Sequence, residues 1–416
     1  MTASAPASAA PQAPTTPYQI LGARPGAVLK PRTPEETAAA LRAASDAGHA
    51  VVPWGAGTKQ RWGNAPTTYD VALDLTALDQ ILEYEPADLV ITAQAGMPLA
   101  ALQAHPRISR QFLPLGPPYA ARATRGGRLA TNASGPSRLL HGTARDMVLG
   151  IRVATPQGDV VKSGGRVVKN VVGYDLNKLH VGGLGTAGVI VEVTFKVQPL
   201  PAAEATVAAT FGDLAAACTV ASRIARSALF PRAVELLREP ASAAWQLFVW
   251  CAGAPDAVDR QVRDTSAWCG EGGSRGATRL DAASHDATWQ RIAGAGRGGE
   301  RDAVLKLTCL PSDLGALLAR LPDHASVVVR AGSGVAYVTL AGASVDDVRR
   351  LSAAAHELRG SGVVEEAPDA IKRALDSWDP AGLAARARND YALMHAIKEQ
   401  FDPRKTLNPG RFVAGI

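Results

Sequence analysis

The chain has 416 residues, 47% of them apolar and 20% charged, which suits two domains better than one hydrophobic core. No apolar run approaches the roughly 18 residues that span a bilayer, and the four cysteines show no C-x-x-C spacing for a metal or cluster. The net charge of +6 includes a stretch, residues 107–169, with 11 basic and 2 acidic side chains. Its few aromatics disfavour nucleic acid and leave an anionic cofactor, an acidic partner or a solvated face.

Residues 1–17 carry no charge and are rich in Ala, Pro, Ser and Thr. They lack the basic start and apolar core of a secretory signal, so a disordered tail in a cytoplasmic protein is predicted. Thr33-Pro34-Glu35-Glu36 then forms a capping-box pattern, and apolar residues at helical spacing predict a helix over 34–47.

A strand over 50–53 leads into the first glycine-rich loop, Pro53-Trp54-Gly55-Ala56-Gly57-Thr58-Lys59. Strands are predicted over 71–75, 81–84 and 89–94, and a helix over 97–103. A second glycine-rich loop, Gly126 to Gly135, is predicted to follow a strand in the same way. Because glycine lacks a Cβ, its amides can approach a bulky anion closely, so the two loops predict a bound dinucleotide phosphate.

A hairpin is predicted over 147–155 and 159–163, followed by a third loop over 182–188 and a strand over 189–197. Gly183 to Gly188 formally satisfies G-x-G-x-x-G. A Rossmann fingerprint opens a helix, however, whereas this one opens an alternating, β-branched strand, so the sequence excludes that interpretation. No Walker motif occurs.

Beyond Pro199–Pro201 the pattern changes to strands alternating with helices, with glycine-rich loops at 270–276 and 294–299. Strands are predicted at 206–211, 245–251, 304–309, 326–330 and 335–340. Helices are predicted after the first two strands, to about Ala228 and Trp268, and over 312–321 and 344–358. This alternation favours an antiparallel sheet covered by helices, and the fold class is α+β. A last amphipathic helix, with Leu393, Ile397 and Phe401 on its apolar face, should end at Asp402-Pro403.

Taken together, these segments resemble the PCMH-type FAD-binding domain of the vanillyl-alcohol oxidase flavoprotein family. Three features carry the resemblance: the Pro-x-Gly-x-Gly-Thr loop, the Thr124-x-Gly126-Gly127 loop, and the Gly185-Thr-x-Gly188 turn. Within that family the sequence is most similar to the FAD-binding E subunits of bacterial glycolate oxidases. This similarity rests on the runs 141–150 and 164–176 and on the ending 401–412.

The resemblance implies a two-subdomain FAD-binding domain over 18–202, an α+β cap domain over 203–370, and a C-terminal helix and tail, 371–416, returning to the FAD domain. FAD would be noncovalent, because Thr58-Lys59 stands where covalently flavinylated relatives have histidine. Lys59 would add a cation near the phosphates or remain solvated. The implied FAD-binding residues are Pro53, Trp54, Gly55, Ala56, Gly57, Thr58, Lys59, Thr124, Gly126, Gly127, Thr131, Ala133, Gly135, Gly142, Asp146, Gly188, Val189 and Ile190.

No catalytic residue is predicted, because the clustered histidines that catalytic relatives place in the second domain have no counterpart here. Arg330 and Tyr337 could bind a carboxylate. The alternative is that Arg330 is an ordinary exposed arginine and Tyr337 an ordinary core tyrosine. The resemblance therefore implies an electron relay, with a second FAD-containing catalytic subunit and an iron-sulfur subunit as partners and any membrane association only through the complex. A self-sufficient dehydrogenase of a hydroxy acid, sugar or lactone, and a scaffold with structural FAD, remain alternatives.

Overall fold

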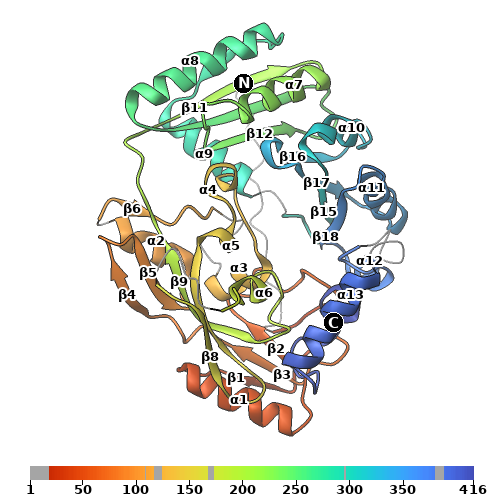
Figure 1. Cartoon of the computed structure of the whole chain (residues 1–416). Helices are drawn as coiled ribbons and strands as arrows, with labels where there is room; N and C mark the ends of the chain where they lie inside the picture. The colour runs from red at the N-terminus through yellow and green to blue at the C-terminus, as the bar shows by residue number, and fades with distance from the viewer. Residues whose placement is uncertain (1–17, 108, 117–123, 167–172, 295–296, 380–387) are drawn as a thin grey trace, which may run out of the picture.

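The computed structural model describes residues 18–107, 109–116, 124–166, 173–294, 297–379 and 388–416 (Figure 1). The predicted tail 1–17 and the run 167–172 lie outside these residues. Within them the strands form an eight-stranded, a five-stranded, a three-stranded and a two-stranded sheet. The first 200 residues build the three smaller sheets, and the eight-stranded sheet forms a second domain above them in Figure 1.

The three-stranded sheet is parallel, in the order β1 (Ala27–Leu29), β3 (Val71–Asp74), β2 (Val51–Trp54). Helix α1 (Pro34–Asp46) precedes β2, and the Oγ1 of Thr33 caps it by accepting from the backbone N–H of Glu36 at 3.0 Å. The buried face of α1 packs into the same apolar cluster as β2 and β3. The predicted helix and strands in this region are confirmed.

The five-stranded sheet is antiparallel, in the order β4 (Ile81–Glu85), β5 (Val90–Gln94), β9 (Val189–Lys196), β7 (Val148–Ala154), β8 (Val160–Gly164). The predicted hairpin is the β7–β8 pair, and the strand predicted after the third glycine loop is β9. Short elements connect these strands: α2 (Leu99–Arg107), β6 (Gln111–Phe112), α3 (Arg125–Thr131), α4 (Arg138–His141), α5 (Ala144–Met147), α6 (Asn177–His180) and β10 (Gln198–Pro199).

The second domain is built on the eight-stranded antiparallel sheet, ordered β14-β11-β13-β12-β16-β17-β15-β18. Its strands are β11 (Ala203–Phe211), β12 (Ala233–Arg238), β13 (Trp245–Gly253), β14 (Ala277–Arg279), β15 (Asp302–Thr308), β16 (Ser326–Arg330), β17 (Val335–Ala341) and β18 (Ser361–Glu366). The predicted antiparallel sheet is confirmed. Strands β12, β14 and β18 were not predicted.

Most helices of this domain cover one face of the sheet and share its largest apolar cluster. They are α7 (Leu214–Ala225), α8 (Pro255–Glu271), α10 (Leu314–Leu318) and α11 (Val345–Glu357). The unpredicted α9 (Ala282–Ala293) packs through Trp289 and Ile292 on the other face, against Leu237 and Phe248. We call the rest of that face, which meets the first domain, the open face.

Beyond α12 (Asp369–Ala374), helix α13 (Arg388–Phe401) carries the chain back to the three-stranded sheet, beside β2. There the N–H of Val51 donates to the carbonyl of Thr406, and the N–H of Asn408 donates to that of Val51. The predicted apolar face of α13 is wrong at Leu393, which is 63% exposed, because the helix instead buries Lys398. Among the described residues no helix is long and apolar enough to cross a membrane.

Candidate functional site

A cleft of about 920 Å³, counting the part open to solvent, lies where five segments of the first 200 residues meet the C-terminal segment. The segments are the loop after β2, the end of β3, the residue after β5, helix α3 with its flanking residues, and the turn that leads into β9. The lining residues are Pro53, Trp54, Gly55, Ala56, Gly57, Thr58, Lys59, Gln60, Leu75, Ala95, Thr124, Gly126, Gly127, Arg128, Ala130, Thr131, Ala133, Leu184, Gly185, Val189, Ile190, Asn408 and Arg411.

Fourteen of the eighteen predicted FAD-binding residues line this cleft, and four do not. Each of the four has a role in local packing. A Cβ on Gly135 would lie 1.7 Å from the Gly116 carbonyl oxygen, and one on Gly188 would lie 2.4 Å from Val153. Gly142 has a φ of +79°, and Asp146 accepts from the N–H and hydroxyl of Thr143. Their contact with a cofactor stays a prediction.

The first part of the second glycine-rich segment is a helix, not a loop as predicted, whereas residues 132–135 are non-helical. Helix α3 begins after Thr124 and contains both Gly126 and Gly127. Its start is held from outside, because the N–H of Gly126 donates to the carbonyl of Ala95 at 2.8 Å. A Cβ on Gly126 would lie 3.0 Å from that of Ala95, so glycine allows this close packing.

The first loop and α3 touch directly at the floor of the cleft. A Cβ on Gly55 would lie 2.0 Å from the Oγ1 of Thr124, and Gly57 has a φ of +70° that favours glycine. Glycine at position 55 therefore lets two protein segments meet, a reason that differs from the close approach to a phosphate expected from the sequence.

Lys59 is held at the edge of the cleft by the second domain. Its Nζ lies 3.0 Å from the Oε2 of Glu365 on β18, and both side chains are largely buried. Burial lowers the pKa of Lys59, but Glu365 and Glu366 outweigh it and the pKa is raised, so the side chain stays charged. Lys59 is not a solvated lysine, and its charge is balanced by protein.

Arg128 is a charged side chain of the cleft whose guanidinium has no protein acceptor in the described part of the chain. It is 3% exposed, and its Nε, Nη1 and Nη2 have no hydrogen-bond partner among the described residues. Burial alone lowers its pKa to about 9, with no carboxylate opposing the shift. A buried guanidinium needs acceptors, so the donor set of the cleft fits an anionic ligand such as the diphosphate of FAD.

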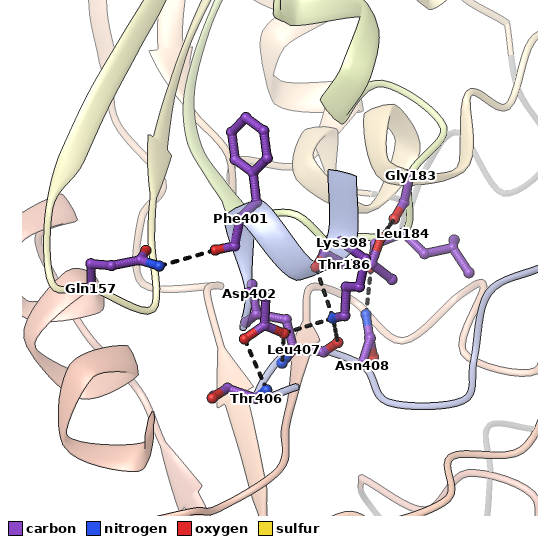
Figure 2. Close-up of polar contacts among 10 residues, drawn as sticks. All are labelled: Gln157, Gly183, Leu184, Thr186, Lys398, Phe401, Asp402, Thr406, Leu407 and Asn408. Carbon is purple, nitrogen blue, oxygen red and sulfur yellow. Dashed lines mark hydrogen bonds and ion pairs between the residues drawn. The ribbon is translucent and has the colours of Figure 1, made fainter. Parts of the chain in front are cut away.

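The C-terminal segment forms one wall of the cleft and is fastened by a buried ion pair (Figure 2). Lys398 Nζ lies 2.6 Å from the Oδ2 of Asp402 and donates to the carbonyls of Leu407 at 2.7 Å and Thr186 at 2.9 Å. Asp402 also accepts from the backbone N–H groups of Thr406 and Leu407. We call these contacts the C-terminal clasp.

The clasp positions two residues in the cleft wall. The side-chain nitrogen of Asn408 donates to the carbonyl of Leu184, while its Oδ1 is buried and has no partner among the residues that the structure describes. Arg411 donates to the side chain and carbonyl of Gln60 and to the carbonyl of Trp62. An amide oxygen and a guanidinium thus join the backbone groups around the cleft.

The open face of the second-domain sheet carries charged residues too, but these are paired. The Nη1 of Arg330 on β16 lies 3.3 Å from the Oε1 of Glu235 on β12, and its Nη2 lies 3.4 Å from the carbonyl oxygen of Ser134. Arg330 also lies over the ring of Tyr337, and both are buried rather than exposed. Burial raises the pKa of Glu235 to about 7 against the pull of Arg330. No metal-binding group of three His, Cys, Asp or Glu side chains occurs among the described residues.

Several lining residues were missed from the sequence: Gln60, Leu75, Ala95, Arg128, Ala130, Leu184, Gly185, Asn408 and Arg411. Arg128 was part of the basic stretch, and Asn408 and Arg411 belong to the ending used for the family resemblance. The signal was therefore present, but the sequence does not show which of these side chains face one cleft.

Comparisons with known proteins identify the class of protein that this chain resembles. Residues 25–164 match the FAD binding domain family, and residues 380–412 match the C-terminal domain of FAD linked oxidases. The alkyldihydroxyacetonephosphate synthase structure shares the fold with a TM-score of 0.69 over 92% of this chain and 77% of that one, at 15% identity. The chain is an FAD-linked oxidoreductase, and FAD is its cofactor.

Individual relatives with curated names are also similar to this chain. The chain is 26% identical to glycolate oxidase subunit GlcD of Bacillus subtilis, over 96% of this chain and 91% of that protein. It is 45% identical to glycolate oxidase subunit GlcE of Escherichia coli, over 32% of this chain and 38% of that protein. It is also 35% identical to a D-2-hydroxyglutarate dehydrogenase of Xanthomonas citri, over 42% of this chain and 38% of that protein. These relatives are named as an oxidase or a dehydrogenase of hydroxy acids.

Proposed function

We propose that this chain is the FAD-binding subunit of a cytoplasmic glycolate oxidase-type complex, with FAD bound noncovalently in the cleft. The cleft carries the proposal, because the segments predicted to hold a dinucleotide meet there around an unpartnered Arg128. Backbone N–H groups around Gly57 and Gly127 and the side chains of Arg128 and Asn408 would hold the cofactor. When bound, FAD accepts two electrons and passes them on.

We further propose that the chain relays electrons to an iron-sulfur subunit and leaves substrate oxidation to a second flavoprotein subunit. A 2-hydroxy acid loses two electrons and two protons on oxidation, so its site needs a base and a cation for the carboxylate. On the open face, the candidate cation Arg330 is already paired with Glu235. The described residues also lack a histidine cluster. Both observations support the relay.

A self-sufficient hydroxy acid dehydrogenase is the second candidate. The observation that favours it is coverage, because a GlcD subunit matches 96% of the chain, whereas the match to a GlcE subunit spans 32% of it. The two candidates differ in whether the isolated chain oxidises substrate.

The test is to purify the chain alone and with co-expressed partner subunits, and to record flavin absorbance before and after adding glycolate, D-lactate or D-2-hydroxyglutarate. The relay predicts a yellow protein whose flavin is bleached only in the complex. Bleaching of the isolated chain by any of the three acids would replace the relay with the second candidate. A colourless product that stays colourless after incubation with FAD would refute the whole proposal.

A further inference from the structure

Six Lys and Arg side chains are at least nine-tenths buried in the part of the chain that the structure describes: Arg128, Arg238, Arg330, Lys372, Lys398 and Arg411. Five of them donate to protein acceptors. Arg330 and Lys398 face carboxylates, while Arg238, Lys372 and Arg411 donate to backbone carbonyls. Arg128 alone of the six has none, and all three of its nitrogens are shielded from solvent.

The position of Arg128 explains what its partner must be. It lies one turn beyond Thr124 on α3 and lines the cleft with Gly127 and Thr131. The opposing loop touches Thr124, the residue before α3, at Gly55, so Arg128 belongs to the helix that begins where the two glycine-rich segments meet. Oxidised FAD carries its negative charge on the diphosphate, which is the part that glycine-rich segments accommodate.

We propose that the Arg128 guanidinium, which is shielded from solvent in the cofactor-free structure, turns into the cleft to bind the diphosphate of FAD, and that its charge remains unbalanced until the cofactor enters. The inference rests on FAD occupying the cleft, as proposed above, and adds a side-chain cation to the backbone amides expected there. Two consequences follow. Removing the charge weakens the cofactor, and it also stabilises the cofactor-free protein, because a buried unpaired charge is replaced by an apolar group.

The experiment uses the full chain with Arg128→Met, Arg128→Lys and the matched control Arg145→Met. Arg145 is an exposed arginine of α5 in the same basic stretch. Dissociation constants for FAD and for ADP, which carries the diphosphate without the flavin, are measured by calorimetry on cofactor-stripped protein. Thermal midpoints are recorded with and without FAD.

R128M should bind FAD and ADP about 10- to 100-fold more weakly than wild type, as for loss of a charge-assisted hydrogen bond. Its cofactor-free midpoint should rise by a few degrees, opposite in sign to the effect on binding. R128K keeps the charge but loses the planar guanidinium, so its dissociation constants for FAD and ADP should lie between those of wild type and R128M. R145M should match wild type in both dissociation constants and in its thermal midpoint.

Three results would overturn the inference: unchanged FAD affinity in R128M, weaker FAD binding with unchanged ADP binding, or a lower cofactor-free midpoint in R128M. If R128M does not fold, R128K serves as the test. Wild-type affinity of R128K for both FAD and ADP would then contradict bidentate binding of the diphosphate by Arg128. A wild-type chain that binds neither ligand would refute the proposed function instead, so the two failures are distinguishable.

Discussion

The cleft in the first domain and the open face of the second-domain sheet both bury charged side chains, but they differ in whether a protein carboxylate pairs with the buried cation. On the open face Arg330 is paired with Glu235, and at its edge Glu365 is paired with Lys59. In the cleft, Arg128 and the Oδ1 of Asn408 have no hydrogen-bond partner among the described residues. Because unpaired buried polar groups are costly, the difference separates a charge that protein pairs from one that a ligand could pair.

The largest effect should come from breaking the C-terminal clasp, which holds the cleft wall in place. Asp402→Ala leaves Lys398 buried without its carboxylate and removes the acceptor of the Thr406 and Leu407 N–H groups. Loss of one partner of a buried ion pair costs about 3–5 kcal/mol. Urea unfolding should show this loss, and the purified variant should carry less flavin per chain.

The matched control is Asp46→Ala. Asp46 pairs with Arg404 of the same C-terminal segment, but both side chains are well exposed. Exposed pairs contribute about 0–1 kcal/mol, so this variant should unfold like wild type and keep its flavin. If D402A and D46A had equal midpoints, the clasp would not be what holds the cleft wall.

An intermediate effect is expected where the two glycine-rich segments touch. In Gly55→Ala the new Cβ would lie 2.0 Å from the Oγ1 of Thr124, so the loop and α3 must separate. Overpacking of this kind costs about 1–3 kcal/mol. The variant should be less stable and should bind FAD more weakly, as measured by urea unfolding and calorimetry.

Truncating the neighbour tests the cause. Thr124→Ala removes the clashing hydroxyl, so the double variant should recover part of the loss and show a clear coupling energy. Gly165→Ala, where a Cβ meets nothing within 4 Å, is the control for a glycine outside the contact. Strictly additive G55A and T124A effects would contradict a direct contact.

The last effect should vary with pH, and it should come from the open face, through Glu235. Burial raises its pKa from 4.5 to about 7, so the folded protein keeps a proton that the unfolded chain has released. The resulting stabilisation is complete below pH 4.5 and is lost as the pH rises towards 7. Glu235→Gln does not titrate, so its stability relative to wild type should increase across this window.

The slope of that difference cannot exceed about 1.4 kcal/mol per pH unit for one proton. Urea midpoints of both proteins between pH 5 and 8 would measure it, and parallel curves would show that Glu235 does not titrate there. Flavin content should be equal in the two proteins, because Glu235 does not line the cleft.

Much of the first domain could be predicted, because its strands alternate and its glycines mark where they end. The exclusion of a Rossmann fold at Gly183–Gly188 was correct for that reason, since β9 follows directly. Helix α3 was missed because adjacent glycines are poor helix formers. The helix is stabilised instead by packing on Ala95, a contact that local sequence does not show.

In the second domain, β12 was missed because all six of its residues are buried and no alternation remains to be read. Leu393 fitted an apolar helix face but lies in solvent. In the site, the basic stretch was noticed as a whole, but only the fold distinguishes buried Arg128 from exposed Arg145. Partners more than two hundred residues apart, such as Leu184 and Asn408, depend on the tertiary structure.

The C-terminal clasp also means that one wall of the cleft is synthesised last. Asn408 and Arg411 leave the ribosome more than two hundred residues after Gly185, which lines the same cleft. Until then the first domain lacks the C-terminal wall of the cleft. The cleft is therefore complete only after residues 398–411 have been synthesised.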